Sequence, residues 1–543
     1  MNRLPVEVLL CIFKLLHPAQ KRECLLVCRL WHHVIESSCL WDTIIITGSN
    51  ALKHSIQGDQ TQQLLIETRN AVELNSLPLL FPYLHFLYIF QQDDSNTKYE
   101  NIDVENFNSW QHHLQSIVGY SLLHHVLSTG TYHKLTNITL KDDPCYMEAP
   151  YTNERIFKCF QSTPALSILR LEDFEIEFDD YEFLHEYAPS LTSLTLCRGA
   201  IEDTPMPNIV MPASKMTHLQ IDWVNLSGYM QARLVTFIIQ KYVNLQHFSF
   251  RMQEKNLESE DYFFIECAEP LIQRLGNQLT TFGINSEISS EVFTLLDESN
   301  YHLQHAEFST RDIIHFTERL ISSNQIHSLS TLTLHWRFSS TLPSFKSLVH
   351  LKSLIFKNIP SHSYNGEPNF SVAFNRLLIE QCPDNLSTLE LYNVNLIIDP
   401  TLLSVPLSLH RLKLESVDMI QDISECLSTC CPQLKEIHIG ASRTQEIILD
   451  LPDLNLSLFE TFNQSRTYLL TDINNEVYVY DGKNTRTHIR HYLKERYGNH
   501  NLSMYPIFKM GLSGSTENRT IINLTCRSLD TLFIDGRIAL QEK

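Results

Sequence analysis

The sequence is short of the residues that define several protein classes. Its 543 residues include only 15 glycines and 21 prolines, too few for a collagen-like or a Gly/Pro-rich low-complexity chain. It has no uninterrupted run of about 18 apolar residues that would predict a membrane-spanning helix. The 13 cysteines are odd in number and form no Cys-x-x-Cys pair, which favours neither a disulfide framework nor a tetrahedral zinc site. We therefore expect a globular chain with reduced cysteines.

Positive charge is also scarce. The chain has 42 Lys and Arg against 62 Asp and Glu, a formal net charge of −20, and no basic run interrupts this balance. Nucleic acid and anionic membranes both reward Lys and Arg, so we expect neither as the main partner. The apolar segment Val6 to Leu16 carries Glu7 and Lys14 and is followed by no small-residue cleavage site. We expect no secretory leader, and a location in the cytoplasm, the nucleus or both.

Motifs for catalysis and cofactor binding are missing. The sequence contains no Gly-x-Gly-x-x-Gly, no Walker loop, no Gly-x-Ser-x-Gly and no His-Glu-x-x-His. Cys426, Cys430 and Cys431 cluster with His438 nearby, but side chains of adjacent residues diverge on a helix, so core packing is favoured over a metal site. We expect no catalytic residue, no metal and no cofactor.

The first forty residues contain two short apolar helical patterns. Pro5 suits the start of the first helix, and Pro18 ends it. Its apolar residues surround most of the helix and are Val8, Leu9, Ile12, Phe13, Leu15 and Leu16. In the second pattern, Cys24, Val27, Cys28 and Trp31 form one stripe at helical spacing. Helices this apolar need burial from several directions, so the segment either caps the domain that follows or docks onto helices of a partner.

The residues of this segment resemble an F-box. The pattern covers residues 3–42 and consists of Leu4-Pro5-x-Glu7-x-Leu9-x-x-Ile12-Phe13-x-x-Leu16, then Leu26-Val27-Cys28-Arg29-x-Trp31, then Leu40-Trp41. The resemblance implies binding to the Skp adaptor of cullin-RING ubiquitin ligases. It assigns Leu4, Pro5, Leu9, Ile12 and Phe13 to insertion into the adaptor. Leu16 is assigned to the same interface, with Val27, Cys28 and Trp31 on its core side or flank.

A second pattern, Leu-x-x-Leu-x-Leu with conservative replacements, recurs through the rest of the chain. From Leu166 to Leu434 its ten steps average about 27 residues, within the range of leucine-rich repeats. The phrases begin at Leu84, Leu135, Leu166, Leu191, Met216, Leu245, Leu279, Leu303, Leu329, Leu351, Leu386, Leu409, Leu434 and Leu529. Helical segments ending in a Pro- or Asn-containing turn precede several of them, for example Phe183–Tyr187 before Pro189. Unrelated strands of an ordinary α/β domain would not keep this step.

This pattern resembles the leucine-rich repeats that often accompany an F-box, which sets the expected fold. We predict an α/β chain in which a short all-helical F-box precedes an α/β leucine-rich-repeat solenoid, a horseshoe with parallel strands on its concave face. The predicted divisions are an F-box at 1–42, a linker and irregular capping repeat at 43–83, the solenoid at 84–440 with a polar insertion near 91–134, and degenerate repeats with a cap at 441–543.

Three stretches depart from the repeat. Ile44 to Ile46 indicate a strand of an initial, irregular repeat. The polar run 91–98 predicts a loop, and the residues from Phe107 to Leu127 predict a single helix. Between Leu434 and Leu529 only degenerate phrases remain, at Leu456/Phe459 and at Val477-x-Val479. For that stretch we predict two or three distorted repeats.

Residues that alternate with the leucines of each phrase face away from the core of a strand. This row is polar and mixed in sign, so it is either a surface that binds a folded protein or a solvated sheet face. The candidate residues are Arg170, Glu172, His218, Gln220, His247, Arg251, His305, His335, Glu390, Tyr392, Arg411 and Lys413. The pairs His218/His247 and His305/His335 lack a third ligand, which favours surface or packed histidines over a metal site.

The two resemblances together predict the substrate-recognition subunit of an SCF-type E3 ubiquitin ligase. Such a subunit is not itself an enzyme; its F-box docks to the Skp-type adaptor, and through it to a cullin-RING ligase, while the repeat face holds a target protein. The competing hypothesis is a non-catalytic leucine-rich-repeat interaction scaffold that acts outside a ubiquitin ligase. A hidden enzyme would need convergent nucleophile and base residues, and the sequence shows no such ordered set.

Overall fold

A computed structural model gives the structure of the chain. It describes residues 9, 13, 24, 27–36, 43–47, 63–68, 77–91, 107–120, 123–128, 130–142, 153–202, 204–224, 228–252, 268–287, 291–310, 312–336, 342–358, 371–399, 406–419, 423–441, 446–461, 466–473, 476–480, 486–488, 519–534 and 537–541. The chain divides into an N-terminal unit, Met1–Glu258, and a C-terminal unit, Ser259–Lys543.

The N-terminal unit alternates strands with short helices. Its strands are β1 (Thr43–Thr47), β2 (Gln63–Thr68), β3 (Phe86–Gln91), β4 (Ser116–Tyr120), β5 (Asn137–Lys141), β6 (Ile168–Glu172), β7 (Glu175–Ile176), β8 (Ser193–Cys197), β9 (Ala200–Ile201), β10 (His218–Val224) and β11 (His247–Met252). Its helices are α3 (Arg29–Glu36), α4 (Leu77–Leu80), α5 (Asn108–Gln111), α6 (Leu123–Leu127), α7 (Asn153–Phe157), η6 (Lys158–Ser162), α8 (Phe178–Tyr187) and α9 (Gly228–Lys241).

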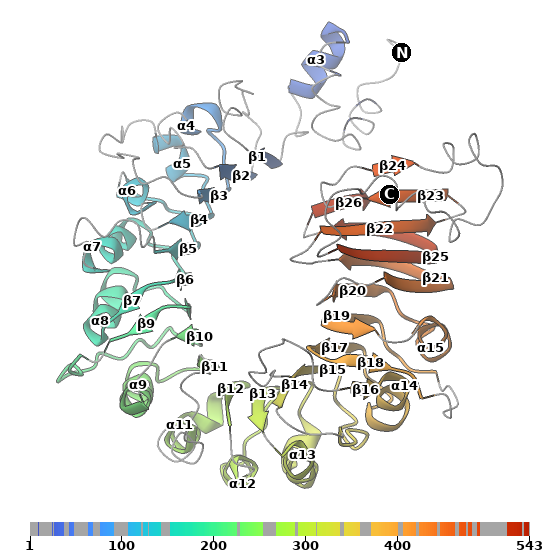
Figure 1. Cartoon of the computed structure of the whole chain (residues 1–543). Coiled ribbons are helices and arrows are strands. Elements are labelled where there is room, and N and C mark those ends of the chain that lie inside the picture. Colours follow the sequence, from blue (N-terminus) through green and yellow to red (C-terminus); the bar gives the residue numbers. More distant parts are fainter. Residues whose placement is uncertain are drawn as a thin grey trace. The chain divides into compact units, whose positions relative to one another are not determined.

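Nine of these strands form one parallel ladder in chain order. The order is β1, β2, β3, β4, β5, β6, β8, β10 and β11, and β7 and β9 pair separately. Helices α5 to α9 lie along one side of this ladder (Figure 1). Parallel neighbours joined through a helix are what a stacked helix-turn-strand repeat produces.

Alternation of side chains places the core between the strands and the helices. In β6, Leu169 and Leu171 are buried, whereas Ile168, the first residue of the same strand, is 44% exposed. Because successive strand residues point to opposite faces, each phrase sends its leucines toward the helices. Phe237 of α9 closes that layer and lies 5.2 Å from the ring of Phe178. We call the other face of the strands the open face.

A ladder of hydrogen bonds fixes where each strand begins. The carbonyl of Ser167 accepts the amides of both Thr192 and Ser193, at 2.9 Å each, and the Thr192 hydroxyl donates to it at 3.0 Å. Thr217 makes the same contacts to the Thr192 carbonyl one repeat later. Ser330 and Ser387 continue the pattern in the C-terminal unit. Two successive amides thus hold neighbouring repeats together at the start of a strand, and where the second residue of the phrase is Thr or Ser its hydroxyl can add a third bond.

The helix predicted over Phe107 to Leu127 is wrong. These residues form α5, then strand β4, then α6, so they complete a repeat unit. Its phrase begins at Leu114, but Gly119 occupies the third apolar position, which disguises the pattern. A Cβ at Gly119 would lie 2.6 Å from Leu123 Cδ1 and 3.2 Å from the Ile89 carbonyl oxygen, so the close approach of helix and strand leaves no room for a side chain. The strand expected at Ile44 to Ile46 is confirmed as β1, and most of the run 91–98 lies outside the described residues.

The C-terminal unit continues the same alternation. Its strands are β12 (Thr281–Glu287), β13 (His305–Thr310), β14 (Thr331–Trp336), β15 (Ser353–Asn358), β16 (Ser371–Ala373), β17 (Thr388–Tyr392), β18 (Asn395–Ile397), β19 (Arg411–Met419), β20 (Glu436–Ala441), β21 (Glu446–Thr461), β22 (Arg466–Ile473), β23 (Glu476–Tyr480), β24 (Arg486–His488), β25 (Arg519–Ile534) and β26 (Arg537–Gln541). Its helices are α11 (Glu269–Leu275), η9 (Gly276–Gln278), α12 (Val292–Glu298), α13 (Ile313–Ser322), η10 (Asn324–His327), α14 (Phe374–Arg376), the π-helix η11 (Leu377–Gln381) and α15 (Ser424–Cys430).

Strands β12, β13, β14, β15, β17, β19, β20 and β21 pair in parallel in that order. The end of the chain differs from the predicted distorted repeats. Phe459 does lie opposite Ile437 as a repeat strand should, but β21 and β25 are 16 residues long and pair with each other. Val477 and Val479 lie in β23, which pairs antiparallel with β22, so that phrase is not a repeat strand.

Together these elements give a mixed α/β chain with long parallel ladders, compatible with a leucine-rich-repeat solenoid. The phrases from Leu84 to Leu434 each lead into a strand of the described residues, whereas Leu529 lies within the 16-residue strand β25. Of the helices that the structure describes, none has the length and apolar character that crossing a bilayer requires.

Candidate functional site

Two parts of the chain offer surfaces for a partner, and the first is the N-terminal helical segment. Leu9 and Phe13 are helical and buried, and the ring of Phe13 meets that of Trp31 edge-on at 5.1 Å. Val34 of α3 is buried as well. Of the apolar stripe expected from the sequence, Trp31 thus packs within the segment, whereas Val27 is exposed.

The same segment leaves other apolar side chains open to solvent. Val27 is 60% exposed and Leu30 is 36% exposed, and Cys28 is half-buried. Of the residues assigned to an adaptor, Leu9 and Phe13 thus contribute to the segment's own packing in this structure, while Val27 lies at the surface. Leu4, Pro5, Ile12 and Leu16 lie outside the described residues. Adaptor binding by all nine residues stays a prediction.

The second part is the open face of the N-terminal unit, where the parallel register aligns side chains in rows. One row runs through Asn137, Ile168, Ser193, His218 and His247, and another through Lys141, Glu172, Cys197, Asp222 and Arg251. His218 and His247 stack, with ring centroids 3.9 Å apart and planes 14° apart. No third metal-ligating side chain joins them, and no group of three or more His, Cys, Asp or Glu in the described residues could hold a metal ion.

Ion pairs join neighbouring repeats along the second row, which runs from Lys141 to Arg251. The Glu172 carboxylate forms ion pairs with the guanidinium groups of Arg170 and Arg198 at 2.6 Å each. Arg198 also pairs with Asp173 at 3.1 Å. Arg251 pairs with Asp222 at 3.2 Å, and Gln220 donates to the same carboxylate. Arg198 and Asp173 were missed from the sequence because they follow their strands instead of lying in them. Both have positive φ, a conformation that places their side chains back over the row.

The open face of the C-terminal unit carries a connected group that we call the Tyr392 cluster. Its members are Glu307, His335, Lys357, Glu390, Tyr392 and Lys413. The ammonium groups of Lys357 and Lys413 lie 5.6 and 5.0 Å from the Tyr392 ring centroid. Its hydroxyl donates to Glu390 at 2.8 Å, and burial raises the pKa of Tyr392 to about 12. The phenol therefore remains a hydrogen-bond donor at neutral pH.

The structure thus places the predicted face residues unequally. His218 and His305 are exposed, and Arg170, Glu172, Gln220, His247, Arg251, Glu390, Tyr392, Arg411 and Lys413 are half-buried. His335 is buried, and its Nε2 lies 2.6 Å from Glu307, so this imidazole faces a carboxylate of its own chain. Beyond the predicted set, His438 bonds Glu460 at 2.6 Å and extends the polar surface to β20 and β21. The signal for it was its position between two leucine-type residues of a phrase.

Several positive and negative groups on these faces are paired with one another, so contacts within the chain order their side chains. Among the cysteines that the structure describes, burial raises the pKa of Cys431 to about 12 and that of Cys382 still further. Thiols held protonated in this way are poor nucleophiles.

Comparisons with known proteins identify the N-terminal segment. Residues 1–47 match the F-box-like family, so the chain carries an F-box-like domain there. No curated protein matches the chain. Among solved structures, a chain of the crystal structure of the mouse RP105/MD-1 complex is similar to it at 13% identity and a TM-score of 0.35, covering 76% of this chain and 74% of that one.

Proposed function

We propose that this protein is the substrate-recognition subunit of an SCF-type E3 ubiquitin ligase. The observation that carries the proposal is the F-box-like domain at residues 1–47, because F-box-like domains typically bind Skp adaptors. Val27 and Leu30 supply exposed apolar surface on that domain. Apolar side chains that a chain leaves open in a small helical module are suited to burial against partner helices.

In this proposal the open faces hold the target protein. Ion pairs and hydrogen bonds already order their side chains. The faces therefore lose less conformational entropy when a target binds. The subunit contributes position and raises the effective concentration of target lysines near the charged ubiquitin, while bond-making belongs to other subunits. The protein would then act as a non-catalytic subunit in the cytoplasm, the nucleus or both, with no nucleic-acid or membrane partner.

Adaptor docking is tested by placing charge on the exposed apolar side chains of the domain. We expect Val27→Glu combined with Leu30→Glu to reduce co-purification of the Skp adaptor at least tenfold, because unpaired carboxylates in a desolvated interface cost several kcal/mol. Val349→Glu is the matched control, since Val349 is a 54% exposed aliphatic residue of the C-terminal unit. Phe13 is a poor choice because it has no exposed surface. Undiminished adaptor binding by the Val27/Leu30 variant would contradict the docking assignment.

The competing scaffold function is distinguished by a second measurement. A ligase subunit brings a cullin with its adaptor, and its partners become more abundant when the proteasome is inhibited. A scaffold acting outside a ligase has stable partners whose amounts do not respond. In the Val27/Leu30 variant the partners should no longer increase when the proteasome is inhibited, although the open faces should still capture them.

A further inference from the structure

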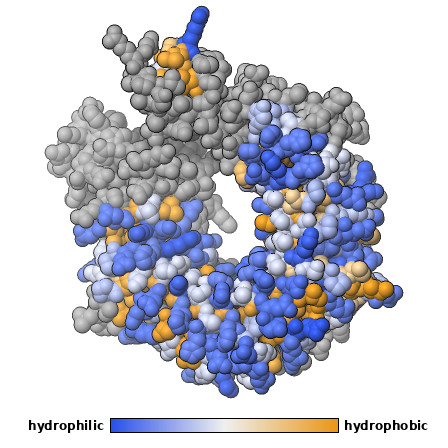
Figure 2. All heavy atoms as spheres, turned by 180° about the vertical axis from the view of Figure 1, so that it is seen from behind, coloured by the Kyte–Doolittle hydropathy of each residue, from blue (hydrophilic) through white to orange (hydrophobic). Residues whose placement is uncertain are grey.

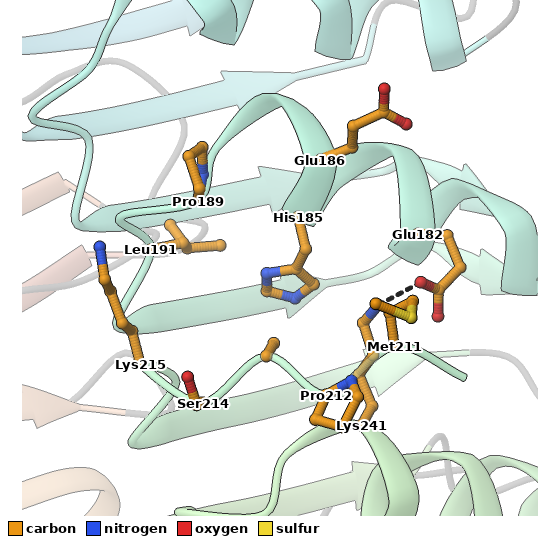
Figure 3. A pocket seen from close by; sticks show the side chains of 11 residues that line it. Glu182, His185, Glu186, Pro189, Leu191, Met211, Pro212, Ser214, Lys215 and Lys241 are labelled. Atoms are coloured by element: carbon orange, nitrogen blue, oxygen red, sulfur yellow. Dashed lines mark ion pairs between the residues drawn. The ribbon is translucent and has the colours of Figure 1, made fainter. Parts of the chain in front are cut away.

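A cavity of about 400 Å³ opens in the N-terminal unit on the side of its helices. It lies between the end of α8, the segment that leads into β10 and the end of α9 (Figure 3). Its lining residues are Glu182, His185, Glu186, Pro189, Leu191, Met211, Pro212, Ala213, Ser214, Lys215 and Lys241. None of them belongs to the F-box-like domain or to the open face, so neither proposed role uses this cavity.

The imidazole of His185 projects into the middle of the cavity (Figure 3). Its Nε2 lies 3.1 Å from the hydroxyl oxygen of Tyr242, a fully buried side chain with no other hydrogen-bond partner in the described part of the chain. If Nε2–H were the donor, the tyrosine O–H would be buried without an acceptor, which is costly. The hydroxyl therefore donates to Nε2, and Nδ1 carries the proton of the ring.

His185 is thus a neutral donor. Burial, together with the charge of Lys241, lowers the pKa of His185 to about 3, so the ring is uncharged at neutral pH. With Nε2 accepting from Tyr242, the tautomer leaves one N–H, at Nδ1, and no partner for it is found among the described residues. A ligand that reaches this ring must present an acceptor.

The charges around the cavity leave one cation available at its rim. The Lys241 ammonium is 2.6 Å from Glu182, and with a side chain only 1% exposed it is neutralised inside the chain. Glu186 also lines the cavity, but its carboxylate is turned away from His185 in Figure 3. Lys215 stands at the rim, and no carboxylate of the described residues pairs with it. The open part of the site therefore favours a single negative charge, because a doubly charged group would also meet the Glu182 carboxylate.

An ordered apolar wall completes the cavity. The Ala213 amide fastens the segment 204–215 to the last residue of α9 by donating to the Lys241 carbonyl at 2.7 Å. Asn244, in the turn after α9, donates to the Ser214 carbonyl at 2.7 Å. Met211 is 64% exposed and Ile209 is 75% exposed on this segment. The segment projects from the unit in Figure 1, and hydrophobic surface gathers on a projection of the molecule in Figure 2.

We propose that this cavity binds a carboxylate ligand with an apolar body. The carboxylate accepts a hydrogen bond from Nδ1–H of His185, Lys215 contributes positive charge at the rim, and the apolar body lies against Pro189, Met211 and Pro212. The donor set fixes the charge and orientation of the ligand, and the wall supplies most of the buried area, the usual division of roles in a small-molecule site.

The test uses the full chain and two matched probes, 3-phenylpropionate and its neutral amide, titrated by calorimetry near neutral pH. We expect the acid to bind at least tenfold more tightly than the amide, since hydrogen bonds to a charged acceptor are the stronger ones. Lys215→Gln should weaken the acid up to about fivefold, as for an exposed ion pair. Lys158→Gln, at another exposed lysine of the unit, should change nothing.

A second variant tests the donor itself. His185→Phe combined with Tyr242→Phe removes the N–H and leaves no hydroxyl unpaired, while keeping two rings that meet edge-on. It should bind the acid at least tenfold more weakly at an unchanged unfolding temperature. Equal affinity for acid and amide, binding of neither by the unaltered chain, or full affinity in both variants would overturn the proposal.

The source of the carboxylate is read from a peptide arm of the same titration. An acetylated hexapeptide ending in phenylalanine is supplied as the free acid and as the amide. Binding of the free-acid peptide alone identifies the C-terminus of a polypeptide as the ligand. Binding of 3-phenylpropionate without either peptide identifies a small organic acid. Carboxylate recognition stands in both cases.

Discussion

The neutral state of His185 has a consequence for stability. In the folded chain the pKa of this imidazole is lowered to about 3 by burial, with the Lys241 charge adding to the effect. In the unfolded chain it returns to about 6.5. Below about pH 6.5 the imidazole binds a proton in the unfolded state and not in the folded state, so the folded state loses stability as the pH falls.

We therefore predict that the N-terminal unit becomes less stable in acid through this one residue. Between about pH 7.5 and about pH 5 the loss attributable to His185 should be about 2 kcal/mol. Urea-unfolding midpoints measured at both pH values would check it, with His185→Phe/Tyr242→Phe as the comparison. A variant that loses as much stability in acid as the unaltered chain would contradict the assignment.

Residue identity in the rows could be predicted from the sequence, but exposure could not. Alternation with the leucines placed Arg170, Glu172 and Tyr392 correctly on the open face. It could not reveal that His335 and Glu307 bury one another, because their pairing depends on the register of β13 and β14. Nor could it place Arg198 over Glu172, because no sequence pattern indicates that Arg198 adopts a backbone conformation with positive φ.

At the scale of the element, the repeat phrase located most strands of the parallel ladders but missed some of them. Leucine-type residues at three positions predicted β6, β8 and their neighbours. β4 escaped because Gly119 fills the last of those positions, and the surrounding apolar residues also suit a helix. The 16-residue β21 and β25 escaped because their pairing is non-local and the phrase recurs only in part.

The hydroxyl at the second position of the Leu191 phrase makes a prediction of its own. Thr192→Val keeps the shape of the side chain and removes the bond to the Ser167 carbonyl, so we expect a loss of about 0.5–1.5 kcal/mol in the free energy of unfolding. Thr195→Val is the control, because Thr195 lies half-buried on the open face of the same strand. The two variants are compared by chemical denaturation; equal losses would show that the ladder adds nothing specific.

At the scale of the whole molecule, a repeat array responds to damage locally, because each repeat contacts only its neighbours. Phe237 is fully buried in α9, with ring contacts to Phe178 and Tyr181 at 5.2 and 5.3 Å. Phe237→Ala should cost about 3–5 kcal/mol in that layer.

We expect hydrogen exchange to reveal how far this damage extends. Amide protection should fall in β8, β10 and β11 of the Phe237→Ala variant and persist in β14 and β15 of the C-terminal unit. An equal fall in both units would mean that the chain unfolds as one cooperative body. The Val349→Glu variant, altered at an exposed site of the other unit, provides the baseline.

The F-box-like domain and the repeated strands were accessible from sequence for different reasons. The F-box-like match rests on a compact motif whose residues are close in the chain. The repeated strands were accessible because one phrase recurs, whereas the composition of the open face was not, because it is assembled from side chains many residues apart. The neighbours of each side chain on that face depend on register, which no single phrase contains.

The ladder of amide hydrogen bonds also bears on how this chain can change in length. Two successive amides donate to one carbonyl of the preceding repeat where a strand begins, as Lys352 and Ser353 do to Ser330, and the paired strands then keep their register along their length. Consecutive phrases accordingly begin as close together as Leu329 and Leu351 or as far apart as Leu351 and Leu386 while β14, β15 and β17 remain in register. Insertions between a strand and the next phrase would enlarge the helical side and leave the spacing of the open face unaltered. The open face is thus insulated from length changes on the helical side.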